Sequence, residues 1–239
     1  MKRLCMAWSV ASLIAMASTV AQASVLTFDT GQDNNERLDS SFGSNLSANI
    51  AGANISNGAT PNIGLTWAPR DNFVDGLDPS VWELHGASTF SHVGDGDILQ
   101  LDLRQGLSVN PTLTFDVDPG FSLQLNSLVI GHATDMTEPA SAWTITISEV
   151  GGGQVFTHTT APLDGQNQDT EDVFFNFLGT SGTDYILEFD SGVLDNGDDV
   201  IHFRGGIDNL SFQQVAVPEP STLMLSALGI PFLLRRRRS

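Results

Sequence analysis

The chain has 239 residues, of which 28 are acidic and 10 are basic, and its single cysteine is Cys5. Six of the basic residues lie at the two ends, so residues 24–216 hold four basic and 27 acidic residues, a net charge of −23. A surface this acidic repels phosphate backbones and excludes nucleic-acid binding, and the absence of cysteine from residues 24–216 excludes disulfides and thiol chemistry there.

The first 23 residues have the pattern of a secretory signal peptide. The basic pair Lys2-Arg3 precedes an apolar run from Leu4 to Val20. Ala21 and Ala23 then supply the small side chains that signal peptidase accepts before its cleavage site. We expect signal peptidase to be a partner and to cleave after Ala23. The alternative, a retained membrane anchor, is disfavoured because serines and small residues dilute the apolar run.

Residues 24–216 are expected to form one all-β domain, an antiparallel β-sandwich. Apolar and polar residues alternate with a period of two, which predicts strands with one buried and one solvated face. Turn residues separate these strands at 118–120, 151–153, 179–183 and 195–197. Residues 31–62, rich in Asn, Ser, Gly and Ala, are expected to hold irregular strands or a surface loop. The expected strands are 25–29, 63–67, 81–84, 99–104, 112–117, 122–130, 143–148, 154–159, 173–178, 185–189, 200–204 and 207–213.

Residues 217–239 contain three elements in a fixed order. Two prolines make a stiff, non-helical joint, because proline restrains its own φ and its predecessor. The 14 mostly apolar residues Ser221–Leu234 follow, and as a helix they reach about 21 Å, short of a 30 Å hydrocarbon core. We therefore expect a short hydrophobic helix that anchors transiently in the inner membrane, with the arginines on the cytoplasmic side. The joint is Pro218, Glu219 and Pro220, and the basic end is Arg235, Arg236, Arg237 and Arg238.

This order of elements resembles the PEP-CTERM sorting signal of exported bacterial proteins. The resemblance covers the last 23 residues, and Pro231 departs from it by interrupting the apolar segment. It implies that an exosortase, an integral-membrane cysteine protease or transpeptidase, recognises and processes the tail. It also implies a Gram-negative cell that makes exopolysaccharide. The alternative is an ordinary C-terminal membrane anchor.

Two segments of the body resemble the first and last strands of jelly-roll domains of the galactose-binding and carbohydrate-binding-module type. They are residues 25–29, Val-Leu-Thr-Phe-Asp, and residues 207–212, Ile-Asp-Asn-Leu-Ser-Phe. The resemblance implies that these strands lie close together and that Asp29 and Asp208 help to bind a structural calcium. Other acidic turns, at 95–97 and 195–199, could supply calcium ligands by composition. The alternative is that all these carboxylates are solvated.

The sequence contains no motif of a zinc enzyme, serine hydrolase or nucleotide-binding protein. Glycosidases need two carboxylates about 5–10 Å apart. The glutamates that could supply them are Glu83, Glu149, Glu171 and Glu188, but no strand motif brings two of them to one face. We therefore expect a protein without catalytic activity.

Carbohydrate binding depends instead on exposed aromatic side chains. Trp67 and Trp143 share strand faces with aliphatic residues, which predicts core positions for both. Trp82 lies in a short segment beside Glu83 and His85 and is the candidate exposed platform, with packing in the core as the alternative.

These observations predict an exported protein of the cell surface or extracellular matrix that binds carbohydrate or exopolysaccharide without turnover. Two alternatives stay open. One is a secreted polysaccharide-active enzyme of the glycosidase type, and the other is a purely structural surface protein.

Overall fold

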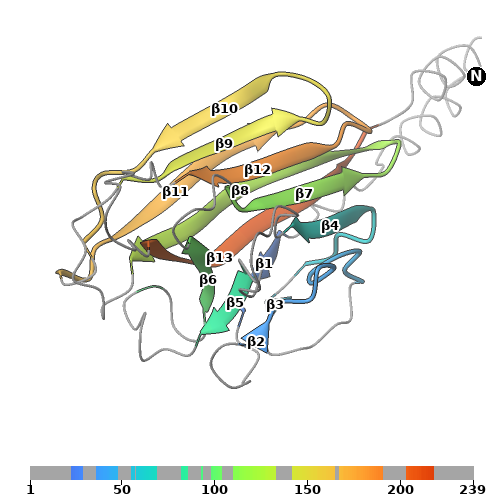
Figure 1. Cartoon of the computed structure of the whole chain (residues 1–239). Coiled ribbons are helices and arrows are strands. Elements are labelled where there is room, and N and C mark those ends of the chain that lie inside the picture. The colour runs from blue at the N-terminus through green and yellow to red at the C-terminus, as the bar shows by residue number, and fades with distance from the viewer. Residues whose placement is uncertain are drawn as a thin grey trace, which may run out of the picture.

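A computed structural model describes residues 23–28, 36–47, 55–56, 58–68, 82–85, 93, 98–103, 110–132, 142–164, 167–190 and 203–217. Within these ranges the regular elements are thirteen β-strands and no α-helix, which confirms the all-β prediction (Figure 1). The predicted tail helix, Pro218, Glu219, Pro220, the four C-terminal arginines and Ala21 lie outside the described residues. No helix in the described ranges is long and apolar enough to cross a membrane.

The larger of two sheets has eight strands, and its main path runs β11-β8-β13-β6-β5-β2. Two further strands extend it, because β1 pairs with β13 and β3 pairs with β1. All its pairings are antiparallel. The strands are β1 (Ser24–Leu26), β2 (Glu36–Arg37), β3 (Ile55–Ser56), β5 (Trp82–His85), β6 (Ile98–Leu103), β8 (Phe121–His132), β11 (Thr170–Leu178) and β13 (Phe203–Ala216).

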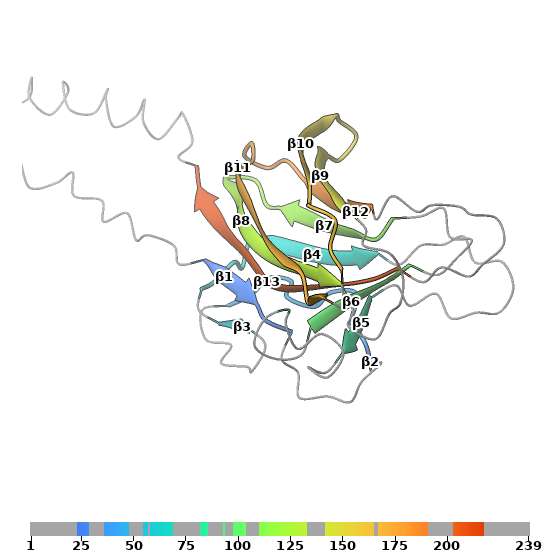
Figure 2. The ribbon, with the colours of Figure 1, turned by 90° about the vertical axis from the view of Figure 1, so that its left-hand side faces the viewer.

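The smaller sheet has five strands in the order β10-β9-β12-β7-β4, again all antiparallel. Figure 2 shows the two sheets as two layers of one sandwich. The strands are β4 (Ile63–Ala68), β7 (Thr112–Val117), β9 (Thr144–Glu149), β10 (Gln154–Thr159) and β12 (Tyr185–Asp190).

The core lies between the sheets because each strand turns its apolar face inward. In β12 the buried residues are Tyr185, Leu187 and Phe189, and in β9 they alternate in the same way. Aromatic side chains cross the interface, as in the edge-to-face pair of Phe115 and Phe212, whose ring centroids lie 5.7 Å apart. Edge-to-face pairs add about 0.5–1.5 kcal/mol to the burial of apolar area.

Most predicted strands and turns are confirmed, and two bounds, 112–117 and 154–159, agree to the residue. The predictions of separate strands at 200–204 and 207–213 are wrong, because β13 runs through both without a break. Gly205 and Gly206 stay extended there, since β6 pairs with them on one side and β8 on the other. The irregular strands expected within 31–62 are present as β2 and β3. The predicted turn at 195–197 lies outside the described residues.

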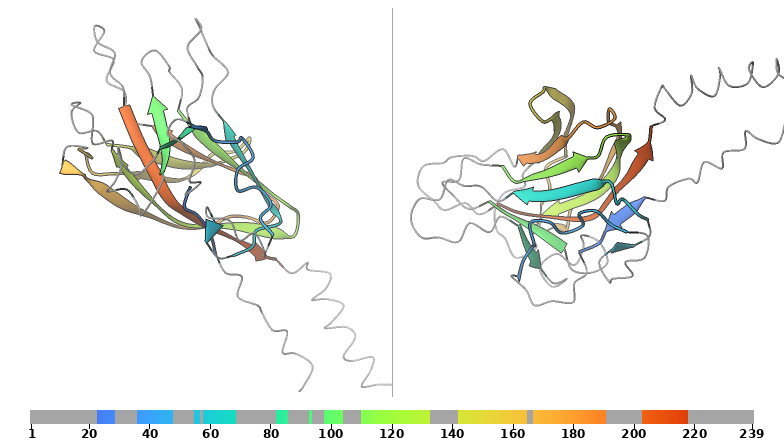
Figure 3. Two further views of the ribbon diagram at one scale, coloured as in Figure 1. Left: turned by 90° about the horizontal axis from the view of Figure 1, so that it is seen from below. Right: turned by 90° about the vertical axis from the view of Figure 1, so that its right-hand side faces the viewer.

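The first and last strands lie side by side, as the jelly-roll resemblance implied. Ser24 pairs with Phe212 and Leu26 pairs with Leu210. Figure 3 shows the blue β1 next to the end of β13. The last described backbone bond runs from the Val217 amide to the Gly120 carbonyl, 2.8 Å away. The described chain therefore starts and finishes at the same end of the sandwich.

Candidate functional site

Trp82 is a core residue, so its predicted role in packing is confirmed and its candidacy as an exposed platform for carbohydrate is wrong. Its side chain is 3% exposed, and its ring centroid lies 4.9 Å from that of Trp67 and 5.9 Å from that of Phe189. The physical reason is that β5 lies inside the sheet, between β6 and β2, with Trp82 and Leu84 on its inner face. Trp67 and Trp143 are buried as predicted.

Of the two predicted calcium ligands, Asp29 and Asp208, the structure describes only Asp208. Asp29 lies outside the described residues, as do the acidic turns at 95–97 and 195–199. Asp208 is 2% exposed, and its carboxylate accepts hydrogen bonds from the Asn209 backbone N–H at 2.6 Å and side-chain amide at 3.1 Å. Asn209 has φ 52° in a bulged part of β13, where Asn is tolerated. Asp208 therefore supports this bulge.

The described ranges contain no group of three or more His, Cys, Asp or Glu side chains that could hold a metal ion. Calcium binding through Asp29 and Asp208 stays a prediction.

The glutamates considered for catalysis lie on different elements. Glu171 on β11 contacts His158 on β10, while Glu188 on β12 accepts a 2.7 Å hydrogen bond from Asn110. Glu149 ends β9. The side chain of Glu83 lies outside the described residues. Glu171 and Glu188 are thus each held by their own partner.

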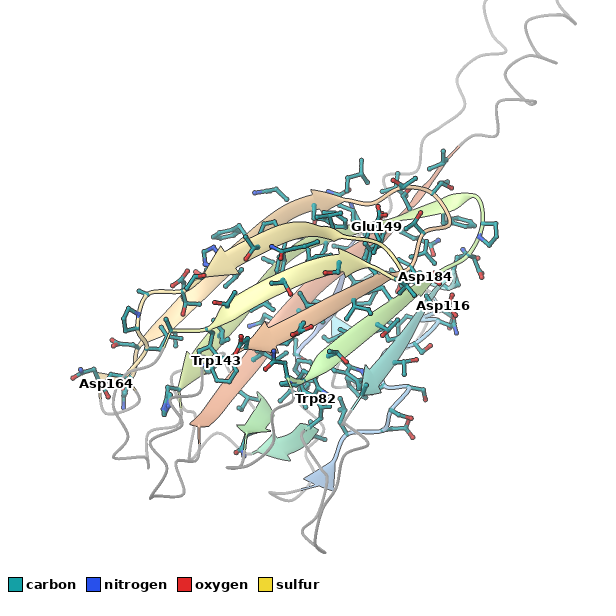
Figure 4. The ribbon with its side chains drawn as sticks, turned by 45° about the horizontal axis from the view of Figure 1, so that its top comes forward. Trp82, Asp116, Trp143, Glu149, Asp164 and Asp184 are labelled. Atoms are coloured by element: carbon teal, nitrogen blue, oxygen red, sulfur yellow. The ribbon has the colours of Figure 1, made fainter. Side chains whose placement is uncertain are left out.

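Two aspartates meet at the end of the smaller sheet. Figure 4 shows Asp116 next to Asp184, with Glu149 at the same end. The pKa of Asp116 is raised above 3.8, mainly by repulsion from the Asp184 carboxylate, and further by partial burial, repulsion from Asp118 and a hydrogen bond with Asp184. Asp184 also accepts a 2.9 Å hydrogen bond from the Val117 N–H. Asp116 is solvent-exposed, so water screens the repulsion.

The outer surface of the larger sheet carries a set of uncharged polar side chains, which we call the amide–hydroxyl face. On it, the Gln213 amide donates to Gln124 Oε1 at 2.6 Å, joining β13 to β8. The Asn126 amide donates to Ser211 Oγ at 3.3 Å, joining the same two strands. All these side chains are half-buried. The face consists of Gln124, Asn126, Ser127, Ser211 and Gln213.

Two large apolar side chains border this face on β11, the edge strand (Figure 1). Phe174 is 66% exposed and pairs in register with Ser127, and Leu178 is 62% exposed and pairs with Gln124. Their neighbours Val173 and Phe175 point the other way and are buried in the core. An aromatic ring therefore lies in water next to a row of amides and hydroxyls.

Our sequence interpretation missed Phe174 because it weighed only tryptophans. The signal is nevertheless in the sequence, since residues 172–178 alternate and Val173, Phe175 and Phe177 form the inward face. That alternation places Phe174 on the solvated side.

Comparison with protein-family models matches residues 216–238 to the PEP-CTERM protein-sorting motif. The chain carries a PEP-CTERM sorting signal. This confirms the resemblance seen in the sequence. The motif implies processing by an exosortase, export and a place at the cell surface or outside the cell. Comparison with curated proteins gives no match.

Several solved structures are similar to this PEP-CTERM protein in fold. TmCBM61 in complex with β-1,4-galactotriose shares 12% identity and a TM-score of 0.31, over 64% of this chain and 88% of that one. CBM28, a carbohydrate-binding module specific for non-crystalline cellulose, shares 12% sequence identity with a TM-score of 0.34. The match covers 76% of this chain and 96% of that chain. The K2 cleaved adhesin domain of Lys-gingipain shares 12% sequence identity with a TM-score of 0.36. The match covers 80% of this chain and 97% of that chain.

Proposed function

We propose that this exported PEP-CTERM protein binds carbohydrate without turnover, through the amide–hydroxyl face and Phe174. The observation that carries the proposal is the 66% exposure of Phe174 beside the polar side chains of β8 and β13. A large aromatic ring left in water on a folded domain loses the free energy that burial would provide. A ligand that covers the ring recovers it.

The chemistry of the face suits a sugar. The C–H groups on one side of a pyranose ring pack on an aromatic ring, while amides and hydroxyls bond its hydroxyl groups. Within the described residues, the bond between Gln213 and Gln124 leaves the Gln124 amide nitrogen and the Gln213 carbonyl oxygen for other partners. The face thus offers both donors and acceptors next to the ring.

The test compares polysaccharide binding by the exported protein and by the variants Phe174→Ala and Phe174→Trp. We expect the alanine variant to bind about tenfold or more weakly, because lost stacking of about 1.4 kcal/mol corresponds to that factor, and we expect tryptophan to preserve binding. Val155→Ala is the matched control, since Val155 is 45% exposed on β10 of the other sheet.

The outcomes separate the three functions. Binding that depends on Phe174, without release of sugar products, supports the proposal. Release of sugar products would establish a polysaccharide-active enzyme. Equal binding by Phe174→Ala and Val155→Ala would show that the binding site does not include Phe174. Failure of every polysaccharide to bind would favour a structural surface protein.

We further propose that the chain is cut at both ends, after Ala23 and within residues 217–239. Intact mass and location in an exosortase-bearing host test this, with a variant ending at Ala216 for comparison. We expect the full chain to lose both end segments and the shortened variant to be mislocalised. An uncut tail, with both forms in the same place, would reduce the tail to a membrane anchor.

A further inference from the structure

The five residues of the amide–hydroxyl face have no ionisable side chain, and the adjacent row of the same outer surface, Asp172, Val129 and Asp208, contains two carboxyl groups. The five residues of the face are two glutamines, one asparagine and two serines. On the bordering strand, Asp172 is exposed two residues before Phe174 and on the same side of β11. Residues two apart on a strand lie about 6.6 Å from each other. The charge nearest to the ring along β11 is therefore negative.

The basic residues of the domain lie elsewhere or outside the described residues. Arg37 is in β2, at the opposite edge of the sheet from β11. Arg204 is near the start of β13, seven residues before Ser211, the β13 residue in the same row as Phe174, which is about 23 Å along an extended strand. Arg70 and Arg104 lie outside the described residues. By strand position, neither arginine is adjacent to Phe174 in the sheet.

We propose that this face selects uncharged polysaccharides and rejects those that carry carboxylate or sulfate groups. The inference rests on the proposed carbohydrate-binding function and names its ligand class. Carboxylates and sulfates are bound in proteins by arginine and lysine, whose charged hydrogen bonds offset the loss of hydration. Amide and serine side chains form hydrogen bonds with the neutral hydroxyl groups of a sugar. They provide no positive charge to balance a carboxylate or a sulfate.

Long-range electrostatics act in the same direction. Residues 24–216 carry a net charge of −23, so a polyanion is repelled before it reaches the face. This repulsion is screened within about 8 Å at physiological salt, whereas stacking and neutral hydrogen bonds depend little on salt. The two ligand classes therefore differ in salt dependence as well as in affinity.

The test is electrophoresis of the exported protein through gels containing a neutral glucan, a neutral galactan or polygalacturonate, with EDTA to prevent bridging by divalent cations. We expect retardation by a neutral polymer at both 20 and 200 mM salt, at least about tenfold stronger than by polygalacturonate at the lower salt. Phe174→Ala must abolish the retardation.

A charge reversal sharpens the test. Asp172→Lys places a cation about 6.6 Å from Phe174, so this variant should gain binding to polygalacturonate that disappears at high salt. Asp118→Lys makes the same change in net charge, but in the exposed turn that follows β7 of the smaller sheet. This control variant should gain no binding to polygalacturonate.

Each result has one meaning. Retardation of the wild type by polygalacturonate as strong as by the neutral polymers, and dependent on Phe174, would overturn the neutral-ligand inference while supporting carbohydrate binding. An equal gain from both lysine variants would show that net charge, and not this face, controls the response, and would also overturn the inference. No retardation by any polymer would overturn the proposed function itself.

Discussion

Asp116 lies exposed where β7 ends, close to the carboxylates of Asp184 and Asp118. Its pKa is raised in the folded protein, mainly by Asp184, so ionisation costs more there than in the unfolded chain. The folded state is therefore penalised at neutral pH. The penalty is lost as the pH falls through the raised pKa of Asp116 toward and below the unfolded value of 3.8.

Asp116→Asn should accordingly stabilise the protein at pH 7 by a few tenths of a kcal/mol, a modest gain because water screens exposed charges. The gain should shrink in high salt and shrink further as the pH falls toward and below 3.8. Urea unfolding at neutral and at acidic pH measures it. Asp172→Asn, at an exposed position on another strand, is the control, and a loss of stability in Asp116→Asn would contradict the assignment.

Gly205 allows Trp143 to lie directly on the backbone of β13. A Cβ atom at position 205 would lie 2.4 Å from Cζ2 of Trp143, which is fully buried. Gly205→Ala should therefore destabilise the fold by about 1–3 kcal/mol through overpacking. Gly153→Ala, where a Cβ meets no atom within 4 Å, should cost much less. Thermal unfolding of the two variants distinguishes them, and equal melting temperatures would show that the Trp143 ring can move aside.

At the scale of elements, Glu171 connects β11, an edge strand of the larger sheet, to β10, an edge strand of the smaller sheet. Its Oε1 lies 2.5 Å from His158 Nε2 on β10, and its Oε2 accepts a 2.9 Å hydrogen bond from the Ala161 N–H. Beneath this pair, the rings of Phe156 and Phe175 meet edge-to-face at 5.4 Å. Among the described residues, the two polar contacts of Glu171 and this aromatic pair connect the two sheets along this side.

Glu171→Ala should destabilise the protein by about 1–2 kcal/mol, because it removes both acceptors. The double-mutant cycle with His158→Ala should show a coupling of about 0.5–1 kcal/mol. Urea unfolding provides both values. Asp172→Ala, the exposed neighbour, serves as the control, and additive single effects would mean that His158 and Glu171 do not stabilise each other.

The strands themselves could be predicted because period-two alternation is local. Thr112–Val117 was found to the residue because it alternates cleanly and is followed by turn residues, and Gln154–Thr159 was found to the residue because the glycines at 151–153 mark its start. β13 was split in the prediction because two glycines interrupt its apolar pattern. Its pairing with β6 and β8, which no local pattern contains, holds those glycines extended.

At the scale of the whole molecule, the adjacency of β1 and β13 permits a circular permutation. Ser24 pairs with Phe212, so a short linker can join Val217 to Ala23. New ends placed in the exposed turn at 151–153 should leave a folded protein with a similar urea midpoint, because that turn packs against little. New ends between Gly205 and Gly206 should prevent folding, since they cut a strand paired on both sides. Failure of the first permutant, or success of the second, would contradict this sheet order.

The sequence by itself determined the sorting signal, the acidic charge and the all-β class. A sorting signal is read as a linear segment, charge is a sum over residues, and alternation is a property of neighbours. Only the tertiary structure decided where Trp82 lies. Its short strand, β5, has no long alternation to mark its inner side, and pairing with β6 and packing against Trp67 and Phe189 bury it, whereas the alternation of β11 already marks Phe174 as outward. Alternation shows that a strand has two faces, but long-range pairing and packing decide which face is covered.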